Sequence, residues 1–159
     1  MEIDFKPTEK QHQAWEFLHD TTTSEVLFGG SAGGGKSYFG AAWLLYSCIR
    51  YPGTRWLMGR AVLKTLKETT LNSFFQVCSD WGIKKGEQYK FNAQSNVIEF
   101  LNGSTIILKD LYAYPADPNF DSLGSLEISG AFIDEVNQCT EKAKNVVASR
   151  IRYKLKEFS

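Results

Sequence analysis

The densest group of chemically useful residues is a glycine-rich segment that ends in a lysine and a serine. Six of the 13 glycines lie between Gly29 and Gly40, and apolar residues on both sides argue against a flexible linker. Residues 30–37 match the pattern G-x-x-x-x-G-K-[ST] at every fixed position. Glycines let the backbone come close to a phosphate chain, whose charge the successive N–H groups and the next helix N-terminus can bind. The segment therefore predicts a phosphate-binding loop.

Each part of this loop has an expected task. Lys36 would supply a point charge to the β- and γ-phosphates of a nucleotide, and the hydroxyl of Ser37 would coordinate Mg²⁺. The other residues expected to bind the nucleotide are Gly30, Ser31, Ala32, Gly33, Gly34 and Gly35. The alternative is a glycine turn with an incidental lysine and serine, which an apolar strand before and a helix after disfavour.

A second candidate site is a pair of carboxylates directly after an apolar run. Asp134 and Glu135 follow Ala131-Phe132-Ile133. Asp134 would hold the Mg²⁺ shell, and Glu135 would orient or deprotonate an attacking water. Because a kinase or a GTPase switch does not usually require the second carboxylate, the pair favours nucleotide hydrolysis. The alternative is an ordinary helix start, with Asp134 as its N-cap and Glu135 in its first turn.

Strands and helices alternate around these two segments. Apolar runs and turn signals predict strands at Ser24–Phe28, Thr54–Gly59, Val97–Leu101, Ser104–Leu108 and Ile128–Ile133. Helical periodicity predicts helices opening at Pro7 and over Lys36–Arg50, Leu63–Trp81 and Lys142–Lys156. Asn102-Gly103 predicts a hairpin between the third and fourth strands. The alternation indicates an α/β fold with a mostly parallel sheet, whose carboxyl edge would carry both candidate sites.

The helix over Leu63–Trp81 is expected to be amphipathic. The stripe at helical spacing comprises Leu66, Thr70, Phe74, Val77 and Trp81.

Composition limits the class of protein. The chain has 159 residues, 18 basic and 18 acidic, so its net charge of zero excludes a histone-like binder but allows local patches or a ring of subunits. Cys48, Cys78 and Cys139 lie far apart without a CxxC pair, which indicates neither a metal site nor a disulfide framework. The start lacks a signal peptide, and the apolar stretch near Gly40–Ile49 is too short to span a bilayer. We therefore expect a soluble intracellular protein.

Three segments together resemble the large terminase subunit of tailed bacteriophages. They are the loop at 29–37, the hairpin at 96–108 and residues 123–135, and the resemblance extends from about Phe5 to Arg152. It implies a RecA-like (ASCE) P-loop ATPase that uses ATP and Mg²⁺ to package double-stranded DNA into a procapsid. The partners it implies are the small terminase subunit, the portal protein and further copies in a homo-oligomeric ring, in the host cytoplasm.

The resemblance also assigns residues. Lys36 and Ser37 match the phosphate-loop pair, and Asp134 and Glu135 match the metal-binding and catalytic acids. Gln11 is similar to the adenine-sensing glutamine of these motors, since an amide can both donate to and accept from the N6/N7 edge. The alternative for Gln11 is a solvated position on the first helix.

The arginines depart from the family pattern. Many terminases carry an arginine inside the phosphate loop and another shortly before the acidic strand, and this sequence has neither. An arginine finger acting on a neighbour's γ-phosphate would therefore be Arg60, Arg150 or Arg152, and Arg60 is the preferred choice. The alternative for Arg60 is a surface charge at the end of a strand.

The length of the chain and the positions of its lysines give expectations about domain extent and DNA contacts. Only 24 residues follow Glu135, and they show neither a strand for a coupling motif nor a nuclease carboxylate cluster. Residues 1–159 are therefore expected to be the N-terminal part of an ATPase domain, with an incomplete sheet and without the nuclease domain. Candidate DNA contacts, or simply solvated lysines, are Lys64, Lys67, Lys84, Lys85 and Lys90. A helicase fragment or a nucleotide-binding fragment without turnover stays an alternative function.

Overall fold

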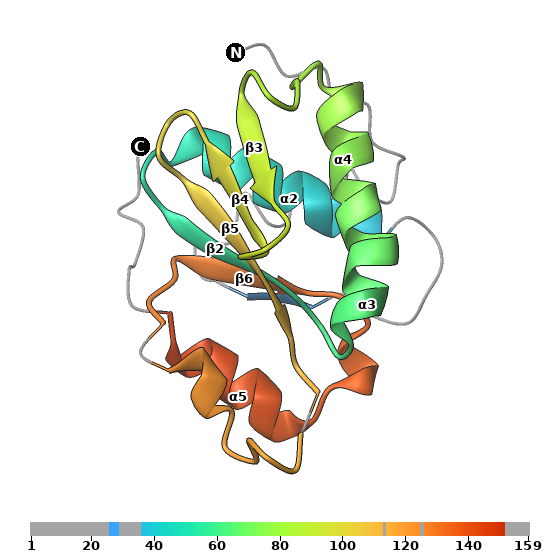
Figure 1. Cartoon of the computed structure of the whole chain (residues 1–159), viewed down its shortest axis with the longest axis vertical. Helices are drawn as coiled ribbons and strands as arrows, with labels where there is room; N and C mark the ends of the chain where they lie inside the picture. Colours follow the sequence, from blue (N-terminus) through green and yellow to red (C-terminus); the bar gives the residue numbers. More distant parts are fainter. Residues whose placement is uncertain (1–25, 29–35, 113, 125, 152–159) are drawn as a thin grey trace.

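A six-stranded sheet with helices on both faces organises the chain (Figure 1). The computed structural model describes residues 26–28, 36–112, 114–124 and 126–151. The strands run in the order β1-β6-β2-β5-β4-β3. Their bounds are β1 Val26–Phe28, β2 Arg55–Arg60, β3 Tyr89–Asn92, β4 Val97–Phe100, β5 Thr105–Asp110 and β6 Gly130–Ile133.

Four of these strands are parallel neighbours. β1 pairs with β6, β6 with β2, and β2 with β5, all in parallel, whereas β4 and β3 continue the sheet in antiparallel fashion. The helix between β1 and β2 is α2 (Lys36–Arg50), as the sequence predicted. The expected α/β fold with a mostly parallel sheet and a β-hairpin is thus confirmed. Because parallel strands end at the same edge, the ends of β2 and β6 lie beside the start of α2.

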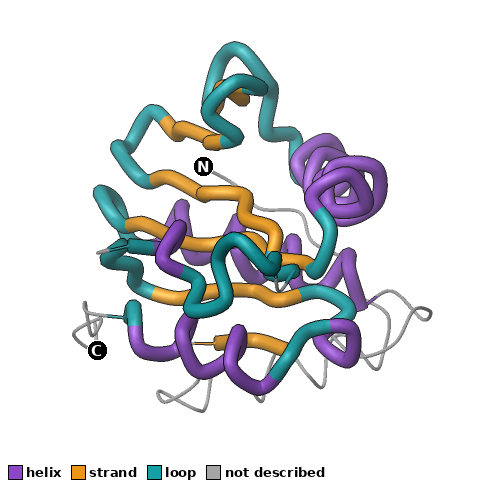
Figure 2. Tube along the Cα trace, turned by 60° about the horizontal axis from the view of Figure 1, so that its bottom comes forward, coloured by secondary structure: helices purple, strands orange, loops and turns teal. Residues whose placement is uncertain are grey.

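The two faces of the sheet bury different side chains because neighbouring residues of a strand point to opposite faces. On β2, Trp56 and Met58 pack with α2 and α4, while Leu57 belongs to the cluster on the other face. That second cluster includes Ala143 and Val147 of α5 (Glu141–Ser149). The helices of the two layers lie on either side of the sheet in Figures 1 and 2.

A glycine sets how closely α2 approaches the sheet. The Phe132 side chain of β6 lies against Gly40, so that a Cβ added there would be 2.1 Å from the ring. The absence of a side chain at residue 40 therefore brings the first turns of α2 against β6, the strand that leads into the acidic pair.

The expected helix over Leu63–Trp81 is present but is not continuous. It consists of α3 (Leu63–Thr65), a π-helical turn η1 (Leu66–Thr70) and α4 (Leu71–Asp80). The Leu71 N–H donates to the carbonyl of Leu66, five residues earlier, which is the hydrogen bond of a π turn. Every residue of the predicted stripe is buried, Thr70 included. The prediction was right about the stripe and wrong about regular α-helical geometry.

The predicted hairpin is confirmed, and a third strand extends it. β4 and β5 pair around Asn102-Gly103, where Gly103 has a φ of +88° that a side chain would strain. Asn102 ties this turn to the helix layer, since its amide donates to the Cys48 carbonyl of α2 at 2.8 Å. The sequence prediction missed β3, an edge strand with polar residues at alternate positions that pairs with β4.

The C-terminal helix is shorter than predicted. α5 starts after Thr140, whose hydroxyl accepts from the Ala143 N–H at 3.1 Å, and it ends at Ser149 instead of Lys156. After the helix, Ile151 forms a parallel bridge with Ile128, and residues 152–156 of the predicted helix lie outside the described residues. Within the described residues, no helix has the length and apolar character needed to cross a membrane.

Candidate functional site

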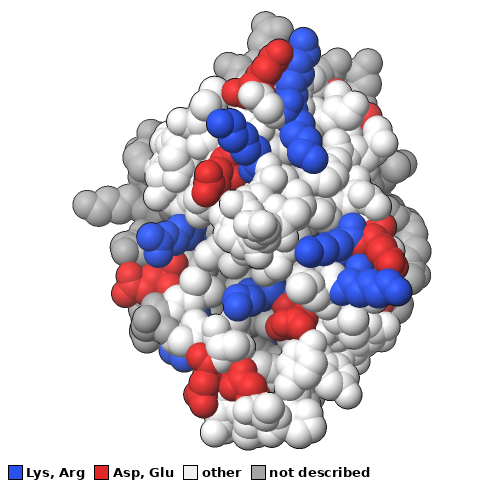
Figure 3. All heavy atoms as spheres, viewed as in Figure 1, with Lys and Arg blue, Asp and Glu red and all other residues white. Residues whose placement is uncertain are grey.

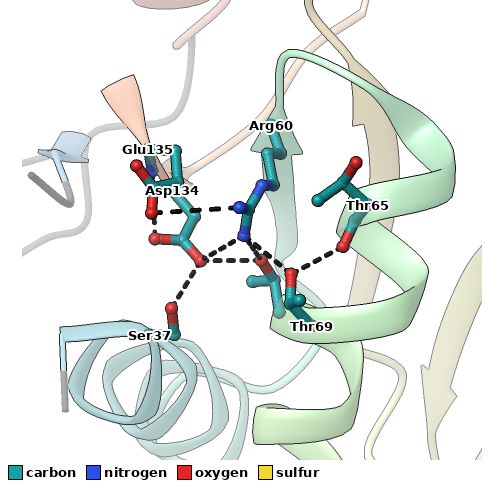
Figure 4. A network of polar contacts seen from close by, with 7 residues as sticks. Ser37, Arg60, Thr65, Thr69, Asp134 and Glu135 are labelled. Carbon is teal, nitrogen blue, oxygen red and sulfur yellow. Dashed lines mark hydrogen bonds and ion pairs between the residues drawn. The ribbon is translucent and has the colours of Figure 1, made fainter. Parts of the chain in front are cut away.

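The carboxyl edge of the parallel strands brings together residues from four separate parts of the chain. β6 ends at Ile133, and the Asp134 N–H still donates to the Gly59 carbonyl of β2 at 2.8 Å, so the backbone of the acidic pair is held beside β2. Figure 4 shows Ser37 of α2 and Arg60 of β2 directed toward Asp134 and Glu135, with Thr69 of η1 in contact with Arg60. Ser37, the last residue of the phosphate-loop pattern, is therefore a neighbour of the acidic pair in space.

Asp134 is the centre of this network and is 1% exposed. Its Oδ2 accepts from the Ser37 hydroxyl at 2.6 Å and from the Thr70 hydroxyl at 2.7 Å. Its Oδ1 accepts from the Glu135 N–H at 3.0 Å, and Arg60 Nη1 lies 3.4 Å from Oδ2. Both carboxylate oxygens are thus hydrogen-bonded, as a buried anion requires.

Glu135 is also buried, at 6% exposed, and has an unusual backbone. Its φ of +50° is in the left-handed region, which costs a non-glycine residue on the order of 1–3 kcal/mol. This conformation turns the chain from β6 into the 3-10 turn η3 (Val136–Gln138). The Glu135 side chain has Arg60 Nη2 at 3.8 Å from Oε1. A strained backbone kept at a buried carboxylate favours a functional explanation.

Arg60 lies inside the site of its own chain. Only 8% of it is exposed, and its guanidinium faces both carboxylates. Nη1 also donates to the hydroxyl of Thr69 at 2.7 Å, while Nε is buried without a hydrogen-bond partner. The alternative interpretation of Arg60 as an exposed surface charge is therefore wrong, because the side chain is buried. Since a side chain that reaches a neighbouring subunit has to be exposed, this burial favours a role of Arg60 within its own site.

The other expected site residues divide into described and undescribed ones. Lys36 is exposed at the first position of α2, and Ser37 is half-buried one residue later. Gln11, the loop residues 30–35 and Arg152 lie outside the described residues. Arg150 is described and lies away from the acidic pair, because its carbonyl accepts from the Ile128 N–H before the start of β6.

Sequence reasoning missed the hydroxyls of η1. Thr70 was expected only as a buried position of a helical stripe, yet its hydroxyl contacts Asp134, 64 residues further along. Thr69 accepts from Arg60 and donates to the Thr65 carbonyl at 2.6 Å, so its hydroxyl is used on both sides. The available signal was a polar residue in a stripe of large apolar ones.

The candidate lysines lie at the surface in two small groups. Lys64 is 4.0 Å from Glu68 one helical turn later, an exposed pair that contributes little. Lys85 lies over the rings of Phe75 and Phe91, with Nζ 4.6 Å and 5.9 Å from their centroids. On the face drawn in Figure 3, basic and acidic side chains are interspersed and form no continuous field of one sign.

The three cysteines are free. Cys48 and Cys78 are buried in the cluster that α2 and α4 form with the sheet, and burial raises the pKa of the Cys78 thiol to about 12. Among the described residues, no three His, Cys, Asp or Glu side chains gather as metal ligands.

Comparison with known proteins points to one group. A family model described as phage terminase large subunit matches residues 21–159. The large terminase of a thermophilic bacteriophage superposes with a TM-score of 0.73 at 15% identity, over 93% of this chain and 37% of that one. The complex of the same terminase with ADP gives 0.72 at 14% identity, over 92% of this chain and 36% of that one. The present chain thus spans little more than a third of the length of that terminase.

A second phage protein has the same fold. The large terminase ATPase domain of Thermus phage P74-26 gives a TM-score of 0.59 at 12% identity, over 92% of this chain and 62% of that domain. No curated protein matches the sequence. The family assignment therefore depends on the family model, and the solved structures add agreement of the fold.

Proposed function

The chain belongs to the phage terminase large subunit family, and we propose that it hydrolyses ATP to drive the packaging of double-stranded viral DNA into a procapsid. The fold agrees with that of the terminase from the thermophilic bacteriophage, which was solved with ADP. Since the chain spans 37% of that protein, the activity of the whole motor is an inference from this part. Residues 1–159 would then be the N-terminal part of the ATPase domain.

One observation supports this proposal above all others. The Ser37 hydroxyl, at the end of the phosphate-loop pattern, donates to the Asp134 carboxylate at 2.6 Å although the residues are 97 positions apart. Two motifs chosen separately for phosphate and metal chemistry therefore meet at the carboxyl edge of a parallel sheet. Ligands of α/β sheets bind at this edge.

The donor set suits a hard divalent cation. Ser37 and Asp134 offer a hydroxyl and a carboxylate oxygen, the kind of ligand that Mg²⁺ prefers. Mg²⁺ is typically held by one or two carboxylates together with the phosphates of a nucleotide, which fits a site with few protein ligands. Ser37 and Asp134 would hold the ion, and the bound ion would offset the charge that develops on the phosphates.

The remaining residues would act directly on the nucleotide and on water. Lys36, exposed at the start of α2, would contact the β- and γ-phosphates, and the loop at 30–35 would surround them with N–H groups. Glu135 would orient the attacking water and accept its proton. Gln11 would contact the adenine edge. Arg60 would balance the two carboxylates from within the same subunit.

The partners follow from the family. We expect double-stranded DNA, the small terminase subunit, the portal protein and further copies of the chain in a ring, within the host cytoplasm. Because the net charge is zero, DNA would be held by local contacts repeated around the ring. The preferred candidates are the exposed lysines at 84, 85 and 90, because Lys85 of this group lies over an aromatic ring.

The test separates binding from turnover. We expect Lys36→Ala to abolish binding of a fluorescent ATP analogue in Mg²⁺, because the phosphates lose their cation. Glu135→Gln should bind the analogue normally and hydrolyse ATP about 10²–10⁴-fold more slowly than the parent chain. Lys64→Ala, which changes an exposed lysine on α3, is the matched control and should alter neither the binding of the analogue nor the rate of hydrolysis.

Three outcomes would redirect the proposal. Normal nucleotide affinity of Lys36→Ala would refute the phosphate-loop assignment. Tight binding with equal background hydrolysis in the parent chain and Glu135→Gln would favour a nucleotide-binding fragment without turnover. Stimulation of hydrolysis by single-stranded but not double-stranded DNA would favour a helicase instead.

A further inference from the structure

We propose that Thr70 is a positioning residue for the metal ligand Asp134. In this inference, which rests on the Mg²⁺ site of the proposed function, the hydroxyl fixes the carboxylate in the orientation that receives the ion. The Thr70 Oγ1 donates to Asp134 Oδ2 at 2.7 Å, on the same oxygen that accepts from Ser37 at 2.6 Å. No sequence motif or family resemblance pointed to this residue.

Burial shows that the contact is specific. Thr70 is 0% exposed, and its neighbours in the stripe, Leu66 and Phe74, are apolar and offer its hydroxyl no side-chain acceptor. A buried hydroxyl without a partner costs free energy, which favours a hydrogen-bonded threonine at such a position. The hydroxyl finds its acceptor in a carboxylate that follows another strand and not in the carbonyl of its own preceding helical turn, which is the usual local alternative.

The π turn explains how the helix presents this hydroxyl. The Leu71 N–H skips to the Leu66 carbonyl, and this wider turn reduces the angle between consecutive side chains. As a result Thr69 and Thr70 both face the site: the first accepts from Arg60 Nη1 at 2.7 Å and the second donates to Asp134. Single π turns inside helices are found frequently at functional sites.

The distribution of donors suggests what the arrangement is for. Asp134 Oδ2 accepts from Ser37 and Thr70, with Arg60 at 3.4 Å, whereas Oδ1 accepts from the Glu135 N–H. The carboxylate is therefore held mainly through one oxygen, and the other oxygen keeps acceptor capacity. A carboxylate that is already oriented loses less freedom when it binds a metal or a metal-bound water. Partners of this kind typically change metal affinity by about 10–100-fold.

The experiment measures the Mg²⁺ concentration that half-saturates binding of a fluorescent ATP analogue. Thr70→Val keeps the shape of the side chain and removes the hydroxyl, and should raise this midpoint by about 10–100-fold. Thr70→Ser keeps the hydroxyl and should restore the midpoint to within a few-fold of the parent. Thr65→Val is the control and should leave it unchanged, because Thr65 joins the network of Figure 4 through its backbone carbonyl.

Several outcomes would decide the question. A parent-like midpoint for Thr70→Val, with the parent chain binding the analogue in a Mg²⁺-dependent way, would overturn the inference and leave the proposed function standing. If Thr70→Val lost affinity for the analogue equally in Mg²⁺ and in EDTA, the inference would also be overturned, because Thr70 would then stabilise the fold and not the metal ligand. Absence of Mg²⁺ dependence in the parent chain would overturn both. If thermal melting shows that Thr70→Val does not fold, Thr70→Ala against Thr70→Ser provides the same comparison.

Discussion

Arg60→Met tests whether the buried acidic pair depends on the buried cation beside it. Methionine keeps an unbranched, flexible side chain, shorter than that of arginine, and removes the charge together with the hydrogen bond to Thr69. The two carboxylates of Asp134 and Glu135, which are 1% and 6% exposed, would then remain in the site without the guanidinium that faces them. We expect a large loss of stability.

The distances give the size of this loss. Arg60 Nη1 lies 3.4 Å from Asp134 Oδ2, and Nη2 lies 3.8 Å from Glu135 Oε1. At an effective dielectric constant of about 20, charges at such distances attract by about 4–5 kcal/mol, before the desolvation of both partners is subtracted. Removing one partner of a buried pair costs about 3–5 kcal/mol, because it leaves an uncompensated charge. The free energy of unfolding should therefore fall by about 3–5 kcal/mol.

The assay is urea unfolding followed by circular dichroism in EDTA, so that no divalent cation replaces the lost charge. Arg55→Met is the matched control, because Arg55 is exposed at the other end of β2 and should change the free energy of unfolding by less than about 0.5 kcal/mol. Adding Mg²⁺ and ADP should recover part of the Arg60→Met deficit. Equal unfolding free energies for the two variants in EDTA would refute the reasoning, since the carboxylates would then not need Arg60.

Further predictions concern packing and the buried thiols. Gly40→Ala should lower the melting temperature, because its Cβ would meet the Phe132 ring at 2.1 Å and overpacking costs about 1–3 kcal/mol, and Phe132→Leu in the same chain should recover part of the loss. Alkylation of the folded chain at about pH 8, read by mass spectrometry, should modify the partly buried Cys139 before Cys48 or Cys78, because a reagent reaches an accessible thiol first. If Cys48 and Cys78 were alkylated at equal rates with and without urea, this prediction would be contradicted. Because burial raises the pKa of Cys78 from 9.0 to about 12, its contribution to stability is complete below pH 9 and is lost as the pH rises toward 12. Cys78→Ala should therefore lose less unfolding free energy than the parent between pH 9 and 12.

Local signals were enough to predict much of the fold. The helix over Lys36–Arg50 agrees to the residue, because glycines precede it and Pro52-Gly53 follows it. The hairpin agrees because Asn-Gly limits the turn geometry. The strand leading into Asp134 was recognised from its apolar residues, though it starts at Gly130 and not at Ile128. In each case the information lies within a few residues of the element itself.

The contacts of the site could not be predicted in this way. Periodicity indicated that Thr70 is buried but could not identify an acceptor 64 residues away. Arg60 ends its strand, a position that the sequence leaves equally open to solvent or to burial. Its environment is decided by the register of β2 against β6, in which Gly59 lies opposite Ile133. The left-handed φ of Glu135 likewise has no signal in the sequence, because such a backbone depends on the surrounding structure.

The charges of the described site indicate why these residues gather around Asp134. Two buried carboxylates face one guanidinium, so the group has an excess of one negative charge before a nucleotide binds. Such an excess is costly in a buried site, and the hydroxyls of Ser37 and Thr70 reduce the cost without neutralising it. A divalent cation would reverse the sign of the group and make it attractive to a phosphate chain. If the chain has the proposed function, metal and nucleotide would assist each other's binding, and Arg60 would hold the acidic pair together until both are bound.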